Sequence, residues 1–494
     1  MVLQVTYIIG IENTSTSKRI QFPDIVRKDI MKQKNTLGYV IFMAVVAAIG
    51  GILFGYDTAV ISGTTAIVKA QFGLSDAGEG WYVGCALIGS ICGVLVAGSL
   101  SDYLGRKLTM LISAALFSIS AIGCAVCGNF DSLVAYRIIG GVGIGIVSIV
   151  SPIYISEVSP AKIRGTLVSL YQLAVTVGFL LAYLMNWVID ANGSLSVAGD
   201  LWTNIWNSEM WRGMLGSETL PALLFFCIIF FIPESPKWLI VKGKLDKASS
   251  VLAKIYASDA EVKEEIATTQ TSLKGETKGA WSDLLKPGIL LAVIAGSAIA
   301  ILGKFMGVNA VLYYGHKIFA DAGFDNPMFS TVLVGVVNCV TTILAVFIID
   351  KVGRKQLIYW GVSGMILCLV AIGVYFAWGA ALGLGNGFML TFFLAYVFCC
   401  AISISAIVFV LLSEMYPNSV RGRAMSIAGF ALWIGTYLIG QLTPVLLGWS
   451  QAGTFFIFAV MCVPYMLIMW KVIPETTGKT LEEIESYWVN RNKK

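Results

Sequence analysis

The sequence predicts an all-α integral membrane protein with twelve transmembrane helices in two pseudo-symmetric six-helix bundles. Three observations support this fold class: the composition, the length of the apolar runs and a repeat of short polar motifs. The 494 residues are 57% hydrophobic and 13% charged, with a mean hydropathy of +0.81, whereas soluble domains carry roughly 25% charged residues. The apolar residues gather in runs of about 20, and a helix of that length crosses about 30 Å of hydrocarbon.

Twelve apolar runs follow one another along the chain, and one long polar stretch divides them six and six. The runs predict spans near residues 38–61, 81–100, 108–128, 132–155, 166–189, 215–232, 289–314, 329–349, 357–378, 387–412, 424–446 and 453–473. The polar stretch is rich in Lys, Glu, Ala and Ser, which is typical of short amphipathic helices. We therefore expect an N-terminal tail, a first bundle, a linker, a second bundle and a C-terminal tail at residues 1–36, 37–232, 233–287, 288–473 and 474–494.

The first 36 residues are polar and basic, and they lack the apolar core and small-residue cleavage site of a signal peptide. We expect them to form a cytoplasmic tail. Because Met31 begins a short basic string just before the first span, we also expect translation to start there, with the preceding residues as an upstream extension. N-terminal sequencing of the protein tests this expectation.

Most of the 34 Lys and Arg residues fall in the two tails, the linker and the loops of one side. The positive-inside rule places that side in the cytoplasm, so both termini are expected there. Lys69, Arg212 and Lys317 fall on the opposite side, and Arg137 and Lys304 fall inside spans. The pattern predicts a multi-pass protein of the plasma (inner) membrane, with lipid as its surroundings.

The composition argues against metal, nucleic-acid and enzyme sites. Eight of the ten cysteines lie singly or side by side in apolar runs and are typical of small packing residues. Cys124 and Cys127 form a C-x-x-C pair, but no second pair with metal spacing follows, and His316 is the single histidine. The basic residues form no stripe for nucleic acid. Because neither a nucleophile with its base nor the glycine loop of an ATPase occurs, the sequence favours a protein driven by gradients.

Three polar motifs occur twice, in the same order, after corresponding spans of the two halves. Residues 102–107 and 350–355 share the spacing D-x-x-G-R-K. A Glu seven residues before Arg-Gly follows both the fourth and the tenth span, and a Pro-Glu pair follows both the sixth and the twelfth. One such motif alone is typical of tight turns and of positive-inside topology. Three matched pairs indicate a parallel repeat of six helices.

The charged residues of these motifs lie at the predicted cytoplasmic ends of the helices. There they can pair between the bundles and close one end of a central path, which opens when the two halves rock apart. The residues concerned are Asp102, Arg106, Glu157, Arg164, Glu234, Asp350, Arg354, Glu414 and Arg421.

The motif set resembles that of the sugar porters of the major facilitator superfamily over residues 38–485. It includes Gly-Gly-Ile-Leu-Phe-Gly-Tyr-Asp at 50–57, Arg-Ile-Ile-Gly-Gly at 137–141 and Pro-Glu-Ser-Pro-Lys-Trp at 233–238. Within the family the chain is most similar to bacterial proton-coupled xylose or hexose symporters. The resemblance implies a monomeric secondary active transporter that takes up a monosaccharide by alternating access, with a proton as coupling ion and no cofactor. The alternatives are a facilitative uniporter and a symporter of a polyol or sugar acid.

Two charges at membrane depth form the expected coupling site. Because a carboxylate inside an apolar span costs several kcal/mol unless it is paired or protonated, Asp57 is a functional candidate, and Arg137 is its expected partner. In similar proton symporters the matching Asp takes up and releases a proton while the matching Arg stabilises its charged form. The alternative is a static ion pair that only fixes helix packing.

The resemblance also implies that certain polar and aromatic residues within the spans contact the solute. These residues are Phe54, Gln172, Lys304, Asn309, Tyr313, Tyr314, Asn338 and Trp433. Amides can donate to and accept from sugar hydroxyls, and aromatic faces can cover the sugar ring. One of the tyrosines, Tyr314, is expected to help gate the outer side. The alternative is that such side chains only hold helices together or anchor them at the interface.

Five positions depart from the family pattern. Phe179 and Leu432 stand where glutamines are common, and Phe409 stands where a tryptophan is common. Gly303 and Lys304 replace two adjacent glutamines. The lysine could bind sugar hydroxyls, bind an acidic sugar, pair with a carboxylate elsewhere or snorkel to water. With fewer hydrogen-bonding groups than a xylose or glucose site, the pocket leaves the identity of the solute open.

Overall fold

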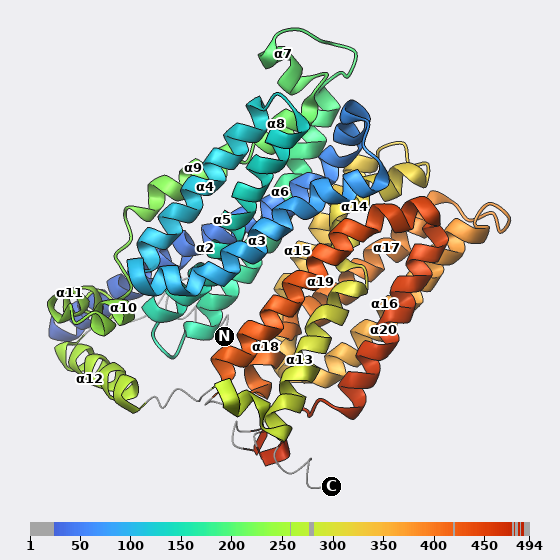
Figure 1. Cartoon of the computed structure of the whole chain (residues 1–494). Helices are drawn as coiled ribbons and strands as arrows, with labels where there is room; N and C mark the ends of the chain where they lie inside the picture. The colour runs from blue at the N-terminus through green and yellow to red at the C-terminus, as the bar shows by residue number, and fades with distance from the viewer. Residues whose placement is uncertain are drawn as a thin grey trace, which may run out of the picture.

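The structure, a computed structural model, describes residues 24–256, 258–275, 281–417, 420–476, 479, 483–484 and 486–488, with the backbone alone at 24–35, 272–275, 281, 346, 350 and 351. Within this part of the chain every regular element is a helix. Twelve helical segments are long and apolar enough to cross a membrane. They stand in two groups (Figure 1), so the predicted all-α fold of two six-helix bundles is confirmed.

The first bundle contains the first six spans. Its helices are α2 (Asp24–Phe72), α3 (Asp76–Leu104), α4 (Arg106–Val126), α5 (Phe130–Val158), α6 (Arg164–Asn192), α8 (Met210–Gly216) and α9 (Thr219–Ile229). The sixth span consists of α8 and α9 together. A short helix, α7 (Leu201–Trp206), stands beyond the tops of these helices in Figure 1. The apolar run of the first span begins near residue 38, but the helix that contains it, α2, already begins at Asp24.

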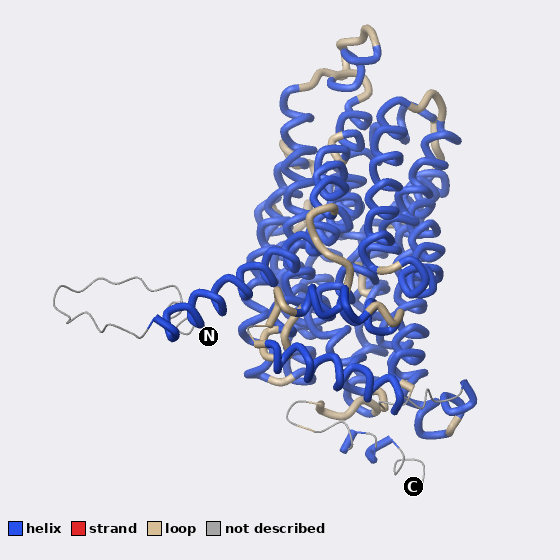
Figure 2. Tube along the Cα trace, turned by 90° about the vertical axis from the view of Figure 1, so that its left-hand side faces the viewer, coloured by secondary structure: helices blue, strands red, loops and turns tan. Residues whose placement is uncertain are grey.

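The polar stretch between the bundles forms short helices, as its composition predicts. They are α10 (Pro236–Val241), α11 (Leu245–Leu252), α12 (Asp259–Gly275) and the 3-10 turn η1 (Trp281–Leu285). Figure 1 places α10 to α12 at the end of the molecule opposite to α7, and Figure 2 shows short helical pieces below the bundles at this same end. We name the end with α10 to α12 the linker end and the end with α7 the far end.

The second bundle contains the last six spans. Its elements are α13 (Pro287–Phe305), α14 (Val308–Asp321), α15 (Pro327–Val352), α16 (Arg354–Trp378), α17 (Asn386–Cys400), η2 (Ala401–Ser405), α18 (Ala406–Met415), α19 (Arg421–Trp449) and α20 (Gln451–Lys471). The two bundles meet where α3 packs against α19, α6 against α15 and α2 against α14.

The seventh span is broken in its middle, where the sequence predicts one continuous helix over 289–314. Gly307 adopts a left-handed backbone with φ of +90° and ends α13, a conformation that glycine takes at little cost. A Cβ at this position would lie 2.4 Å from the ring of Phe458, so a side chain has no room. The hydroxyl of Tyr396 donates to the carbonyl of Met306 at 2.8 Å, which satisfies a backbone group that the break leaves free.

The tenth span also departs from a regular helix. Its middle, η2, is a π-helical turn between α17 and α18. Such turns are rare and often occur at functional sites.

Glycines bring α3 and α5 into backbone contact. A Cβ on Gly89 would lie 2.2 Å from the carbonyl oxygen of Ile138, and one on Gly141 would lie 2.0 Å from that of Ala86. Small residues are the usual means by which membrane helices approach closely. This contact fixes the position of α5, which carries Arg137 and also packs against α2.

We expect Gly89→Val to lower the melting temperature of the detergent-purified protein and its monodisperse yield, because the new side chain would overlap the α5 backbone. Overpacking of this kind typically costs about 1–3 kcal/mol. The matched control is Gly98→Val on the same helix, where nothing lies within 4 Å of an added Cβ. Equal losses in the two variants would show that this glycine contact is not needed.

Candidate functional site

A buried ion pair lies at membrane depth in the first bundle. Nη1 of Arg137 on α5 donates to Oδ1 of Asp57 on α2 at 2.6 Å. The two residues are 3% and 4% exposed. The guanidinium also lies 6.0 Å from the centre of the Tyr82 ring on α3, so three helices surround the pair. The structure therefore brings together the two residues that the sequence proposes as partners.

A pocket between the bundles opens beside this pair. Its lining includes Phe54, Asp57 and Arg137 from the first bundle and Tyr313 and Trp433 from the second. The rings of Phe54 and Trp433 lie 5.9 Å apart at an angle of 37°, which places aromatic faces of both bundles at one point. Five of the residues proposed from the sequence thus line one space.

The start of α14, just after the break in the seventh span, supplies polar groups near this pocket. Nδ2 of Asn309 donates to the hydroxyl of Tyr313 at 2.8 Å. Oδ1 of Asn309 is buried and has no hydrogen-bond partner among the described residues. A buried acceptor without a partner is costly, and it is the kind of group that a solute hydroxyl satisfies. Tyr314 is also fully buried, and it donates to the carbonyl of Gly440 at 2.6 Å.

Gln172, Asn338 and Lys304 do not line this pocket. Lys304 lies in the last turn of α13, where the negative end of the helix dipole favours a cation. Gly303 faces Ile404 and Tyr465 inside the second bundle, and the lysine is turned by about 100° from that direction. Within the described part of the chain no side chain forms an ion pair with its ammonium group.

Near the ion pair, sequence reasoning missed the buried acid Glu218, which lies between α8 and α9. It is 2% exposed, and its Oε1 has no hydrogen-bond partner among the described residues. Its carboxylate interacts electrostatically with Asp57 and Arg137. The neighbouring Ser217 shares a hydrogen bond of 2.6 Å with Tyr56 of α2. The signal was present in the sequence, since this acid stands inside the sixth apolar run.

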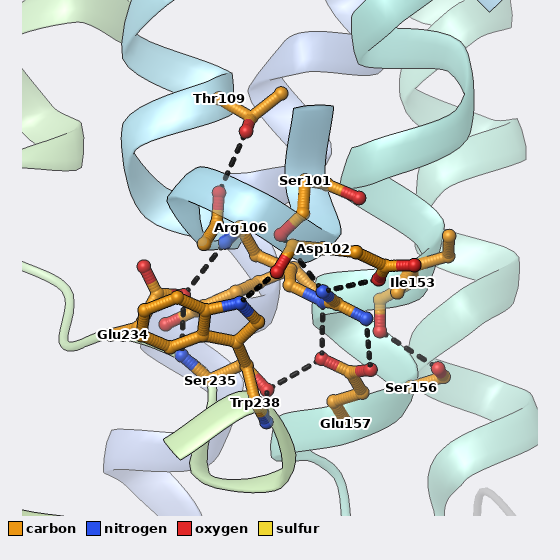
Figure 3. A network of polar contacts seen from close by, with 12 residues as sticks. Ser101, Asp102, Arg106, Thr109, Ile153, Ser156, Glu157, Glu234, Ser235 and Trp238 are labelled. Atoms are coloured by element: carbon orange, nitrogen blue, oxygen red, sulfur yellow. Dashed lines mark hydrogen bonds and ion pairs between the residues drawn. The ribbon is translucent and has the colours of Figure 1, made fainter. Parts of the chain in front are cut away.

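At the linker end of the first bundle, charges from three helices and the linker form one network (Figure 3). Arg106, the first residue of α4, donates to both oxygens of Glu157 at 3.0 and 3.1 Å and to Asp102 at 2.9 Å. Ser235 donates to the same glutamate at 2.5 Å. A two-pronged contact between arginine and carboxylate is among the stronger charged hydrogen bonds.

Glu234 covers the N-terminus of α4. Its carboxylate accepts the backbone N–H groups of Arg106 at 2.8 Å, Lys107 at 3.2 Å and Ser235 at 2.8 Å. A helix N-terminus is a favourable place for an anion. Burial raises the pKa of the Glu234 carboxyl, and the three N–H groups act in the opposite direction. Gly105 must be a glycine, since its φ is +99° and a Cβ would meet this carboxylate.

The second bundle repeats this arrangement. Arg354 donates to Glu414 at 3.1 Å, Thr476 donates to the same carboxylate at 2.5 Å, and the N–H of Lys355 reaches Glu475 at 3.1 Å. The repeated motifs therefore fold into corresponding networks. The backbone of Asp350 lies in α15, but its side chain lies outside the described part of the chain.

Two further arginines also occupy equivalent places. Arg164 at the start of α6 donates to the carbonyl of Ser159 at 3.4 Å, and Arg421 at the start of α19 donates to that of Tyr416 at 3.3 Å. All these linker-end contacts join residues of the same bundle, whereas the sequence led us to expect pairing across bundles. Each network braces its own bundle in this conformation. Pairing of these charges across the bundles stays a prediction for a different conformation of the protein.

We expect Arg106→Gln and Glu157→Gln to be coupled in a double-mutant cycle, because each removes the partner of the other. The expected coupling in the free energy of unfolding is about 1–3 kcal/mol. The more exposed pair of Lys286 and Asp283, at 2.9 Å and with side chains 66% and 27% exposed, is the control, with an expected coupling of about 0–1 kcal/mol. Thermal unfolding of the purified variants measures both values, and equal couplings would contradict a bracing role.

The chain matches known sugar transporters over nearly its whole length. The family model for "Sugar (and other) transporter" matches residues 43–488. The arabinose-proton symporter of Bacillus subtilis (strain 168) is 38% identical over 461 residues, which cover 92% of this chain and 97% of that protein. The D-xylose-proton symporter of Escherichia coli (strain K12) is 37% identical over 499 residues, covering 94% and 99%.

Solved structures agree with the sequence matches. The xylose transporter XylE from E. coli in an inward-open conformation superimposes with a TM-score of 0.77 at 35% identity, covering 91% of this chain and 100% of that one. The same proton:xylose symporter bound to 6-bromo-6-deoxy-D-glucose gives a TM-score of 0.73, covering 92% and 100%. Twelve spans, a duplicated charge network and a pocket between two bundles accompany these matches. The chain belongs to the sugar transporter family of the major facilitator superfamily, and it is a transporter rather than an enzyme.

Proposed function

We propose that this protein is a secondary active transporter that takes up a xylose-like or hexose-like monosaccharide together with a proton. The observation that carries the proposal is the buried pair of Asp57 and Arg137, which lines the pocket between the bundles. A carboxylate at that depth has two stable situations, paired with the arginine or protonated. A site that switches between them can couple proton movement to opening and closing.

The proposed cycle uses alternating access. Protonated Asp57 and the solute bind from the outside while the far end is open, and closure of the far end then occludes both. Separation of the bundles at the linker end releases the solute inward. The proton leaves as Arg137 pairs with the charged carboxylate, and the empty carrier returns. The charge networks at Arg106 and Arg354 hold each bundle rigid, so the bundles can move as units.

We assign the linker end to the cytoplasm and the protein to the cell membrane, because the basic residues gather at that end. One chain contains both bundles, so we propose that a monomer transports. The solute would pack against the rings of Phe54 and Trp433, which touch each other in this conformation, and would bond with Asn309 and Tyr313. Gln172 and Asn338 are proposed to approach it in other conformations, and Tyr314 is proposed to help close the outer side.

Asp57→Asn should abolish accumulation of solute against a gradient but preserve exchange, because the neutral amide imitates the protonated carboxyl. The measurement is uptake of labelled xylose, glucose, galactose, inositol and glucuronate into proteoliposomes, with and without an inward proton gradient. Asp131→Asn, at the exposed start of the helix that carries Arg137, is the control and should behave as the wild type. Equilibration that needs neither the gradient nor Asp57 would identify a uniporter and reduce the ion pair to structure.

A second candidate solute class is a sugar acid, and Lys304 supports it. Its ammonium lies at membrane depth, and no described side chain neutralises it by an ion pair. An unpaired ammonium at that depth is expensive, and a carboxylate on the solute would compensate for it. The proton would then enter together with a uronate rather than a neutral sugar.

Lys304→Gln separates the two solute classes. If the solute is an acid, the variant should lose glucuronate uptake by tenfold or more while xylose uptake stays equal or rises, as loss of a charge-assisted hydrogen bond implies. The control is Lys286→Gln, which alters an exposed lysine just before the same helix. No glucuronate uptake by the wild type would eliminate the acid candidate.

A further inference from the structure

A cluster of charges lies at the far end, away from the pocket and from the linker-end networks. Nζ of Lys69 on α2 and Nζ of Lys317 on α14 each donate to Oε2 of Glu79 on α3, and both distances are 2.9 Å. The first lysine also pairs with Asp76 at the start of α3. One carboxylate therefore holds a lysine of its own bundle and a lysine of the other bundle.

The glutamate is enclosed, unlike most surface ion pairs. The side chain of Glu79 is 0% exposed, and its Oε1 has no hydrogen-bond partner among the described residues. A buried carboxylate is tolerated when cations stay beside it, and removal of a partner from a buried pair is costly. Exposed pairs, by contrast, contribute little. The contact with Lys317, 19% exposed, is thus worth more than a rim contact.

The surrounding contacts show that this end is shut. A Cβ on Gly80 would lie 2.1 Å from the carbonyl oxygen of Gln441 on α19, so the two helices touch through their backbones. The amide of Gln441 donates to the carbonyl of Ala77 at 3.0 Å, and the N–H of His316 reaches Ser62 at 3.3 Å. When the far end opens, these contacts separate, and Lys317 must leave Glu79.

We propose that Glu79 and Lys317 form the outer lock of the transport cycle, an ion pair that stabilises the far-end-closed conformation and sets how often the far end opens. The two are positioning residues for transport and touch no solute. Lys69 belongs to the same bundle as Glu79 and moves with it, so it keeps the glutamate neutralised in both conformations. The lock goes beyond the proposed function. It rests on that proposal only for the assignment of the far end to the outside and for the alternating opening of the two ends.

The two lysines provide a matched comparison. Lys317→Gln removes the bond across the bundles, while Glu79 keeps Lys69, so the fold is retained. Lys69→Gln removes a bond of equal length to the same oxygen, but within one bundle. Only the first substitution shifts the balance toward the open far end.

Hydrogen–deuterium exchange of the full chain in detergent or nanodiscs tests this lock without solute or proton gradient. For Lys317→Gln we expect roughly five- to tenfold faster exchange in far-end peptides from residues 76–84, 308–321 and 439–449, in the range of ordinary coupling free energies. Linker-end peptides around 102–107 and 350–355 should exchange more slowly, because opening one end closes the other. Lys317→Arg and Lys69→Gln should not show this pair of opposite changes.

Faster exchange at both ends of Lys317→Gln would mean general destabilisation and would overturn the proposal. The absence of any change in Lys317→Gln would also overturn it. So would faster far-end and slower linker-end exchange in Lys69→Gln. Should the glutamine variant fail to fold, Lys317→Met serves in its place, since its apolar chain has a similar length. Proton coupling plays no part in the readout. A uniporter that has this lock would show the expected exchange changes but no proton-driven accumulation in the uptake assay. A symporter that lacks the lock would accumulate solute but would not show the exchange changes.

Discussion

The ion pair between Asp57 and Arg137 constrains the rest of the first bundle. Two opposite charges in hydrocarbon are stable when water and lipid are kept away and the atoms stay in contact, in this protein at 2.6 Å. Close packing of α3 against α5 through glycines such as Gly89 supplies that enclosure, and Tyr82 adds an aromatic face to the guanidinium. A second acid, Glu218, is buried near this pair, and its Oε1 has no hydrogen-bond partner among the described residues.

The two ends of the molecule are held by different kinds of contact. At the linker end, Arg106 and Arg354 each bind a carboxylate within their own bundle, and the pattern occurs twice because the chain is a repeat. At the far end, Glu79 reaches Lys317 across the bundles, and α3 touches α19 through its backbone. Two internally braced bundles that contact each other at the far end give a physical basis for rocking about the pocket between them.

The pocket depends on both bundles and on an irregular helix. Phe54 and Trp433 come from opposite halves and meet at 5.9 Å. The break at Gly307 ends one half of the seventh span, and the first turn of the next half places Asn309 close to the pocket. A straight helix would satisfy its own backbone groups, whereas a broken one needs partners such as Tyr396. The irregular backbone is therefore placed where protein, not lipid, surrounds it.

The sequence by itself determined the number of spans, the duplication and the charges at membrane depth, because hydropathy and motif spacing are local properties of the chain. It also indicated the partner of Asp57, through a resemblance rather than through geometry. The tertiary structure decided which distant groups meet: Arg106 contacts Glu157 within its bundle, and Lys317 contacts Glu79 from 238 positions away. It also decided that Gln172 lies outside the pocket that Trp433 lines. Such pairings depend on the rotation and depth of each helix against its neighbours, and a run of apolar residues does not encode either.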